Sequence, residues 1–176
     1  ALPTGLSFDT STGEISGTPT VLSTQTTYTI YANNTGGEST TTIDITVIDE
    51  APFALFYSGS PYTYTKGTAI TDVSPNSFGG AVVTWSINPV LPTGLSIDSS
   101  TGTISGTPTV LSNVTTYTVT ATNTGGFDTI DIDITVNDVI PSISYNGAPF
   151  TETKDSAMAP QAPTVSGGAV VTWSVS

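Results

Sequence analysis

The chain has 176 residues and a formal net charge of −12, with Lys66 and Lys154 as its only basic residues. Nucleic acid and anionic membrane surfaces are therefore not expected as partners, since binding them requires lysine and arginine against phosphate. The sequence contains neither cysteine nor histidine, which excludes disulfides and thiolate metal sites and removes the commonest general base.

The composition favours an all-β fold with a hydrophobic core. Hydrophobic residues make up 36% of the chain. No apolar run approaches the roughly 20 residues of a membrane-spanning helix, so membrane insertion is not expected. Charged residues are only 9%, so threonine, serine and asparagine must cover most of the surface.

Apolar and polar residues alternate between turn signals, which is typical of the strands of a sandwich. In chain order the predicted strands are 6–8, 14–16, 26–33, 41–48, 53–57, 62–66, 82–87, 97–98, 103–105 and the strand from Ile130 to Val136. The first two should form a hairpin around the loop Asp9–Gly13, in which Gly13 supplies a positive φ.

The alternation also predicts which side chains face the core, because a slip of one residue would expose every isoleucine of a strand. Polar residues such as Asp44 and Asp133 should face solvent. The residues predicted to face inward are Ile43, Ile45, Val47, Val83, Trp85, Ile87, Ile130, Ile132, Ile134 and Val136.

The sequence repeats itself with an offset of 89 residues, from Leu2 to Leu91. Both copies carry LPTGLS-[FI]-D-x-S-T-G-x-ISGTPT, followed by TTYT and a Gly-Gly pair. The offset later falls to 88, from Gly79 to Gly167, so we expect one residue to be lost near Tyr57–Gly59. A repeat of this length indicates a tandem array of structural units.

This motif resembles the putative-immunoglobulin repeats of bacterial and archaeal surface proteins, which are related to cadherin-like, dystroglycan-type domains. The resemblance implies tandem immunoglobulin-like β-sandwiches of about seven strands strung as a rod, at the cell surface or outside the cell. Trp85 and Trp173 resemble the buried tryptophan of such sandwiches, and Tyr28 and Tyr117 are candidates for a tyrosine corner.

Aligning the copies predicts three parts. Residues 1–51 correspond to the C-terminal half of one repeat, 52–138 to a complete repeat and 139–176 to the N-terminal half of the next. Half a sandwich leaves a core face and strand edges open. We therefore expect each half to be completed head to tail, either by a continuing chain or by strand exchange between copies of the protein.

Calcium is the only cofactor for which the sequence offers candidates. Asp49, Glu50 and Asp138 lie at the junctions between repeats, with Asp9 and Asp98 as secondary candidates. Carboxylate oxygens suit calcium, and the cadherin-like relatives bind it between domains. The alternative is that these acids provide solubility and form turns.

Catalysis is not expected. Nucleophilic triads need a base, and the pair Asp131 and Asp133 lies on an outward strand face. Lys66 and Lys154 occupy equivalent positions and are candidates for an intramolecular isopeptide bond. An exposed charge that protects a strand edge is the favoured interpretation of both lysines.

The predicted function is a structural repeat unit of an extracellular filament, sheath or giant adhesin stalk. The alternative is a glycan-recognising adhesion module that presents exposed aromatic residues such as Tyr57, Tyr62 and Tyr64. An exposed aromatic patch beside a cleft would favour binding, whereas buried aromatic residues would favour the structural role.

Overall fold

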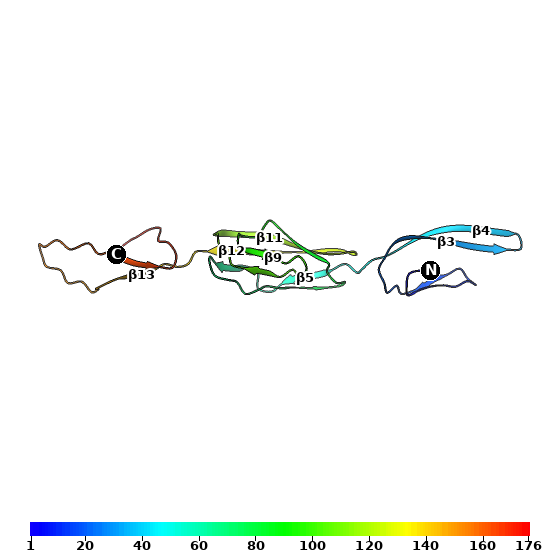
Figure 1. Cartoon of the computed structure of the whole chain (residues 1–176), viewed down its shortest axis with the longest axis horizontal. Coiled ribbons are helices and arrows are strands. Elements are labelled where there is room, and N and C mark those ends of the chain that lie inside the picture. Colours follow the sequence, from blue (N-terminus) through cyan, green and yellow to red (C-terminus); the bar gives the residue numbers. More distant parts are fainter.

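The computed structural model describes residues 1–176 and contains strands but no helices. Figure 1 shows three modules in a row along the longest axis, as expected for a rod. We call them the N-terminal module (1–48), the middle module (49–137) and the C-terminal module (138–176). The structure contains no helix that is long and apolar enough to span a membrane.

The strands are β1 (Leu6–Phe8), β2 (Ile15–Gly17), β3 (Ser23–Asn34), β4 (Gly37–Val47), β5 (Phe53–Tyr57), β6 (Tyr62–Thr65), β7 (Pro75–Phe78), β8 (Thr84–Asn88), β9 (Leu95–Ile97), β10 (Ile104–Gly106), β11 (Ser112–Asn123), β12 (Gly126–Asn137), β13 (Ser142–Tyr145) and β14 (Pro163–Ser166).

The middle module is a complete sandwich. One sheet has the order β6-β12-β11-β8, with β6 parallel to β12 and the other pairs antiparallel. The pairs β5-β7 and β9-β10 form the opposing side. The module therefore has eight strands, one more than expected, because Pro75–Phe78 pairs with β5 although its sequence lacks a clear strand pattern.

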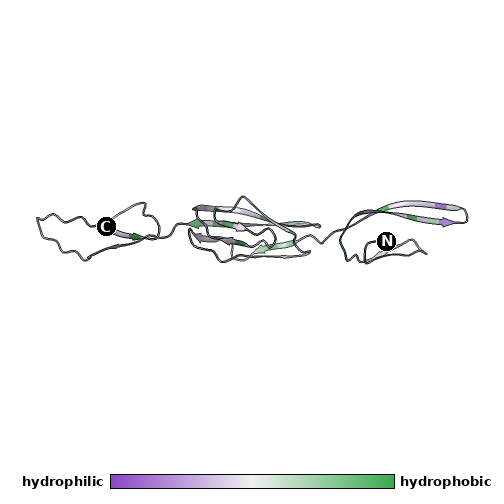
Figure 2. Cartoon of the chain, in the orientation of Figure 1, coloured by the Kyte–Doolittle hydropathy of each residue, from purple (hydrophilic) through white to green (hydrophobic).

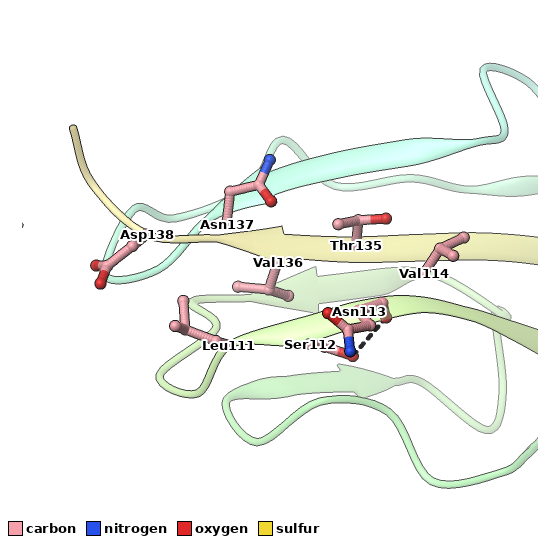
Figure 3. A pocket seen from close by; sticks show the side chains of 8 residues that line it. All are labelled: Leu111, Ser112, Asn113, Val114, Thr135, Val136, Asn137 and Asp138. Atoms are coloured by element: carbon pink, nitrogen blue, oxygen red, sulfur yellow. Dashed lines mark hydrogen bonds between the residues drawn. The ribbon is translucent and has the colours of Figure 1, made fainter. Parts of the chain in front are cut away.

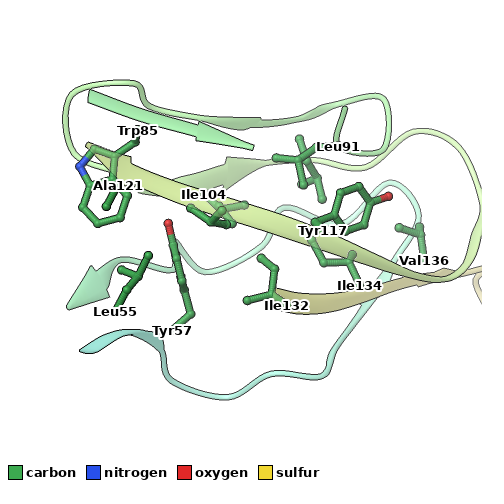
Figure 4. Packing of buried hydrophobic residues seen from close by; sticks show 12 residues of the cluster. Leu55, Tyr57, Trp85, Leu91, Ile104, Tyr117, Ala121, Ile132, Ile134 and Val136 are labelled. Carbon is green, nitrogen blue, oxygen red and sulfur yellow. The ribbon is translucent and has the colours of Figure 1, made fainter. Parts of the chain in front are cut away.

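The core lies between these two sides, and Figure 4 shows side chains from both converging on it. Three of the four predicted inward positions of β12 are buried, Ile132, Ile134 and Val136, and Ile130 is half-buried at the edge of the core. The buried hydrophobic residues are Leu55, Tyr57, Trp85, Leu91, Leu95, Ile104, Tyr117, Val119, Ala121, Ile132, Ile134 and Val136. On the outer face, Asp131 and Asp133 accept hydrogen bonds from Thr118 and Thr116.

The N-terminal module repeats only the second half of this sandwich. Its hairpins β1-β2 and β3-β4 have the registers of β9-β10 and β11-β12; Tyr28 pairs with Ile43 as Tyr117 pairs with Ile132. No counterpart of β5–β8 covers it. The C-terminal module contains β13-β14, the counterpart of β5-β7. Figure 2 shows apolar stretches on strands of all three modules.

The pairing of β13 with β14, compared with that of β5 with β7, shows where the C-terminal module has one residue fewer than the middle module. Tyr145 pairs with Pro163 as Tyr57 pairs with Pro75, and Ser142 pairs with Ser166 as Phe53 pairs with Phe78. Between these pairs β5 has one residue more than β13, forming a bulge at which Ala54 has φ 51°. The expected loss near Tyr57–Gly59 is therefore wrong: the missing residue is the one that makes this bulge.

Two further predictions are corrected. Val83 is exposed, because β8 begins only at Thr84, whereas Trp85 faces the core as predicted. Tyr117 is buried and Tyr28 half-buried, but neither hydroxyl donates to a backbone carbonyl, so neither residue forms a tyrosine corner. Two other tyrosine hydroxyls of the module donate to backbone carbonyls: Tyr57 to Gly102 at 2.5 Å, in the core, and Tyr62 to Ser58 at 2.8 Å, at the surface.

Candidate assembly interface

Hydrogen bonds to its aspartate set the conformation of the loop of the β9-β10 hairpin. The Asp98 carboxylate accepts backbone hydrogen bonds from Ser100 and Thr101, at 2.7 and 2.9 Å. The Gly102 amide donates to the Asp98 carbonyl at 2.8 Å, and Gly102 has φ 72°. The Ser100 and Thr101 amides hold the pKa of Asp98 below its usual value, because their hydrogen bonds to the carboxylate stabilise its ionised form.

In the middle module this loop is covered by side chains from the first half of the repeat. A Cβ atom added to Gly102 would lie 2.6 Å from Cδ2 of Trp85 and 2.7 Å from Cγ of Pro75. The Trp85 amide donates to the Ser99 carbonyl at 2.9 Å. Together with the Tyr57 hydroxyl, these contacts fix the first half of the sandwich on the second.

The N-terminal module has the same loop without its cover. Asp9 accepts hydrogen bonds from the Ser11 hydroxyl and from the Ser11 and Thr12 amides, and these bonds hold its pKa below the usual value. Gly13 has φ 76°, close to that of Gly102. A Cβ atom added to Gly13 would meet nothing within 4 Å, so the space that Trp85 and Pro75 fill in the middle module is open here.

The face around this loop is the uncovered side of a sandwich. A hollow of about 380 Å³ opens on it, lined by six hydrophobic residues among seven. Its lining comprises Ala1, Leu2, Phe8 and Tyr28–Tyr31. Ile43, Ile45 and Val47 are only half-buried, whereas their counterparts in β12 are fully buried. The predicted inward face is therefore correct, but half of its packing is missing.

The C-terminal module shows the complementary exposure. Trp173 is 53% exposed, whereas its counterpart Trp85 is 8% exposed. The segments 150–153 and 172–176 align with β6 and β8 but are not strands. In the middle module β6 pairs only with β12 and β8 only with β11, so their counterparts have no partner strand here.

The first residues of the middle module, Asp49 and Glu50, are held to its β11-β12 turn by hydrogen bonds with the Asn123 and Thr124 side chains. The Asn123 side chain donates to the Glu50 carbonyl at 2.7 Å, and the Asp49 amide donates to the Thr124 hydroxyl at 3.1 Å. The Asp49 carboxylate accepts a hydrogen bond from the same hydroxyl at 3.0 Å. These bonds hold the Asp49–Glu50 segment against the turn between β11 and β12.

The acids predicted as calcium ligands do not converge. Asp138 accepts from the Val139 amide at 2.9 Å, and Asp9 and Asp98 each cap their own loop. Nowhere does the structure bring three or more acidic side chains into a group that could hold a metal ion. The geometry of Asp9 and Asp98 matches the alternative, turn-forming role, and calcium binding at Asp49, Glu50 and Asp138 stays a prediction.

The tyrosines expected to form an exposed patch do not form one. Tyr57 is buried, and Tyr62 and Tyr64 are half-buried and stacked with ring centroids 5.9 Å apart. Burial raises the pKa of all three hydroxyls, and that of Tyr64 reaches about 12. The exposed aromatic residues on this side are instead Phe53, Phe56 and Phe78, which sequence reasoning missed because the bulge at Ala54 shifts the alternation of β5.

Other candidate positions carry little chemistry. Figure 3 shows the hollow between the start of β11 and the end of β12, in which Asp138 is the only ionisable residue. Lys66 is exposed, and Lys154 is paired on the surface with Asp155 at 3.1 Å. An isopeptide bond requires a buried lysine beside a carboxyl group, and neither residue has that setting.

Sequence comparison now identifies the fold family. Residues 1–48 and 46–137 each match the family described as "Putative Ig domain". The chain belongs to this immunoglobulin-like family. The two matches meet at the junction between the N-terminal and middle modules, and the second spans the complete sandwich.

The chain is also similar in sequence to part of proteins that are named as adhesins. The chain is 34% identical over 152 residues to a "Serine-rich adhesin for platelets" of Staphylococcus aureus, covering 84% of this chain and 6% of that protein. The protein of that name from strain MRSA252 is also 34% identical, over 154 residues and 11% of its length. The chain thus spans only a small part of these relatives.

Two solved structures align with about three quarters of the chain, both with TM-scores below 0.5. Extracellular domains 3–5 of Drosophila OTK align with a TM-score of 0.43 and 16% identity, covering 77% of this chain and 47% of that one. Immunoglobulin domains 1–5 of Sidekick-1 align with a TM-score of 0.34 and 18% identity, covering 76% of this chain and 29% of that one.

Proposed function

We propose that the chain is a structural repeat unit of an extracellular adhesin stalk or filament, in which each open half is completed head to tail by the next unit. The observation that carries this proposal is the complementary exposure of the two end modules. One exposes the face that β5–β8 cover in the middle module, and the other carries counterparts of β5–β8 without the strands they pair with.

The likeness to serine-rich adhesins supports the stalk role and a location at the cell surface. The net charge of −12 and the threonine-rich outer faces suit a surface that stays solvated. The binding alternative has less support. Tyr57 is in the core, and the hollow in Figure 3 holds one acid without a neighbouring base.

The energetic reason for completion is the apolar surface that it would remove from water. In the middle module the surface buried in this way includes Trp85 and Tyr57 from the first half of the sandwich and Ile104 and Ala121 from the second (Figure 4). Full burial of each large hydrophobic side chain contributes roughly 1.5–3 kcal/mol. A half sandwich with Trp173 and Tyr145 exposed lacks this contribution, so completion is favourable wherever the partner half is available.

A two-copy chain tests the proposal. Two copies are joined through one proline, because Pro89 links Asn88 to Val90 in the middle module. The junction module then contains 138–176 of the first copy, the proline and 1–48 of the second. We expect acrylamide to quench one indole in two in the single chain, since Trp173 is exposed and Trp85 is buried. In the two-copy chain we expect one in four.

An accessible fraction that stays at one in two in the two-copy chain contradicts the proposal. Sedimentation of the single chain over a range of concentrations then separates the two forms of completion. Growth into long oligomers indicates strand exchange between copies. A single chain that stays monomeric, beside a two-copy chain with the buried indole, indicates completion by a continuing chain.

A further inference from the structure

The loop Asp9–Gly13, here called the Gly13 loop, lies on the open face of the N-terminal module. The middle module shows which contacts its counterpart makes in a complete sandwich. The Gly13 loop already has the conformation of its counterpart Asp98–Gly102. The Gly13 amide donates to the Asp9 carbonyl at 2.7 Å, and the equivalent bond at Gly102 is 2.8 Å. The loop therefore needs no rearrangement to receive what covers Gly102 in the middle module.

The C-terminal module carries all three residue types that cover Gly102. The register of β13-β14 equates Tyr145 with Tyr57 and Pro163 with Pro75. The sequence repeat equates Trp173 with Trp85. None of the three is buried where it stands, and the Tyr145 ring lies edge-on to Phe150, with ring centroids 6.4 Å apart.

We infer that Tyr145, Pro163 and Trp173 of one unit close over the Gly13 loop of the next unit, and that the missing side chain at Gly13 is what admits them. The inference rests on the proposed function and names the docking site within it. The Tyr145 hydroxyl donates to the Gly13 carbonyl, as Tyr57 does to Gly102. The Trp173 ring and the Pro163 ring lie against the Gly13 Cα.

The occupant of this site is another copy of this chain, contributing its residues 138–176. The first half of the middle module is already seated on its own Gly102 loop, through Trp85, Pro75 and Tyr57. Other positions differ between the repeats: Glu152 replaces Tyr64 and Gln161 replaces Val73. The three residues that meet the loop glycine are the same in both, so the loop is the shared element of the two docking sites.

Gly13→Ala tests this contact. In the single chain the new methyl group meets nothing within 4 Å, so the only effect is the strain of alanine at φ 76°. In the junction module of the two-copy chain it collides with Trp173 and Pro163 of the first copy. We expect the equilibrium constant for opening the junction module, followed by Trp173 quenching in urea, to rise at least about tenfold.

Gly147→Ala in the first copy is the matched control. Gly147 belongs to the same junction module, has φ 83° and meets only Phe150, at 3.8 Å. Its counterpart Gly59 meets only Tyr62, at 3.4 Å, so the substitution introduces similar strain without a collision between the two halves. Gly102→Ala is the positive reference, because it should disrupt the middle module in the single chain by the same overlap with Trp85 and Pro75.

The possible outcomes distinguish the docking site at Gly13 from head-to-tail completion in general. A junction module that opens more readily with Gly13→Ala than with Gly147→Ala supports the inference. A junction module that forms and responds equally to both substitutions overturns the docking site at Gly13 and leaves the proposed function standing. A two-copy chain in which Trp173 stays exposed without any substitution overturns both.

Discussion

Replacing Ile134 by alanine will lower the free energy of unfolding of the middle module by about 2–5 kcal/mol, the range for removing a buried isoleucine side chain. Ile134 is completely buried between the two sides of the sandwich. The cavity cannot close easily, because Ile132 and Val136 beside it are also held in the β11-β12 ladder. Calorimetry should show a fall in the melting temperature of the middle module of at least about 8 °C.

Ile45→Ala is the internal control for this result. Ile45 occupies the equivalent position in β4 but is only half-buried, because the other side of its sandwich is absent. We expect a markedly smaller loss of stability in the single chain. In the two-copy chain, Ile45→Ala in the second copy should become as destabilising for the junction module as Ile134→Ala is for the middle module. Equal effects in the single chain would contradict this account.

The second large effect is expected at the tryptophans. Trp85→Ala should destabilise the middle module by about 3–5 kcal/mol, because the indole is buried against Gly102 and the core. Trp173→Ala should change the stability of the single chain by no more than about 0.5 kcal/mol, because that indole is exposed.

In the two-copy chain the losses of stability caused by these two substitutions should become similar. There, Trp173→Ala in the first copy should open the junction module by an amount similar to the effect of Trp85→Ala on the middle module. Calorimetry or far-ultraviolet circular dichroism follows both without relying on the fluorescence that the substitutions remove. A Trp173→Ala variant with no effect on the junction module would show that the indole is not part of a completed core.

The sequence allowed much of the fold to be predicted, because the physical signals were local. Strict alternation in Ile43–Val47 and Ile130–Val136 specified both the strands and their buried faces. The two hairpin loops could be located from the repeated motif. Their conformation is local, because the Asp9 and Asp98 carboxylates accept hydrogen bonds from backbone amides no more than three residues away. These features depend on neighbours along the chain, which the sequence displays directly.

What sequence reasoning missed depends on distant partners. Strand β7 begins with Pro75 and has little alternation, and it forms because β5 lies beside it. The bulge at Ala54 turns Tyr57 into the core and leaves Phe53 and Phe56 outside, which no local pattern indicates. Segment 172–176 shows the converse: its sequence matches β8, but without a β11 counterpart beside it no strand forms.

The most direct test of head-to-tail completion is amide hydrogen exchange of the two-copy chain compared with the single chain. We expect the amides of residues 150–153 and 172–176 to exchange rapidly in the single chain. In the first copy of the two-copy chain they should become protected, because they pair there with β4 and β3 of the second copy. Strands β6 and β8 of the middle module, protected in both chains, provide the reference. Exchange of 150–153 and 172–176 that is equally fast in both chains would contradict head-to-tail completion.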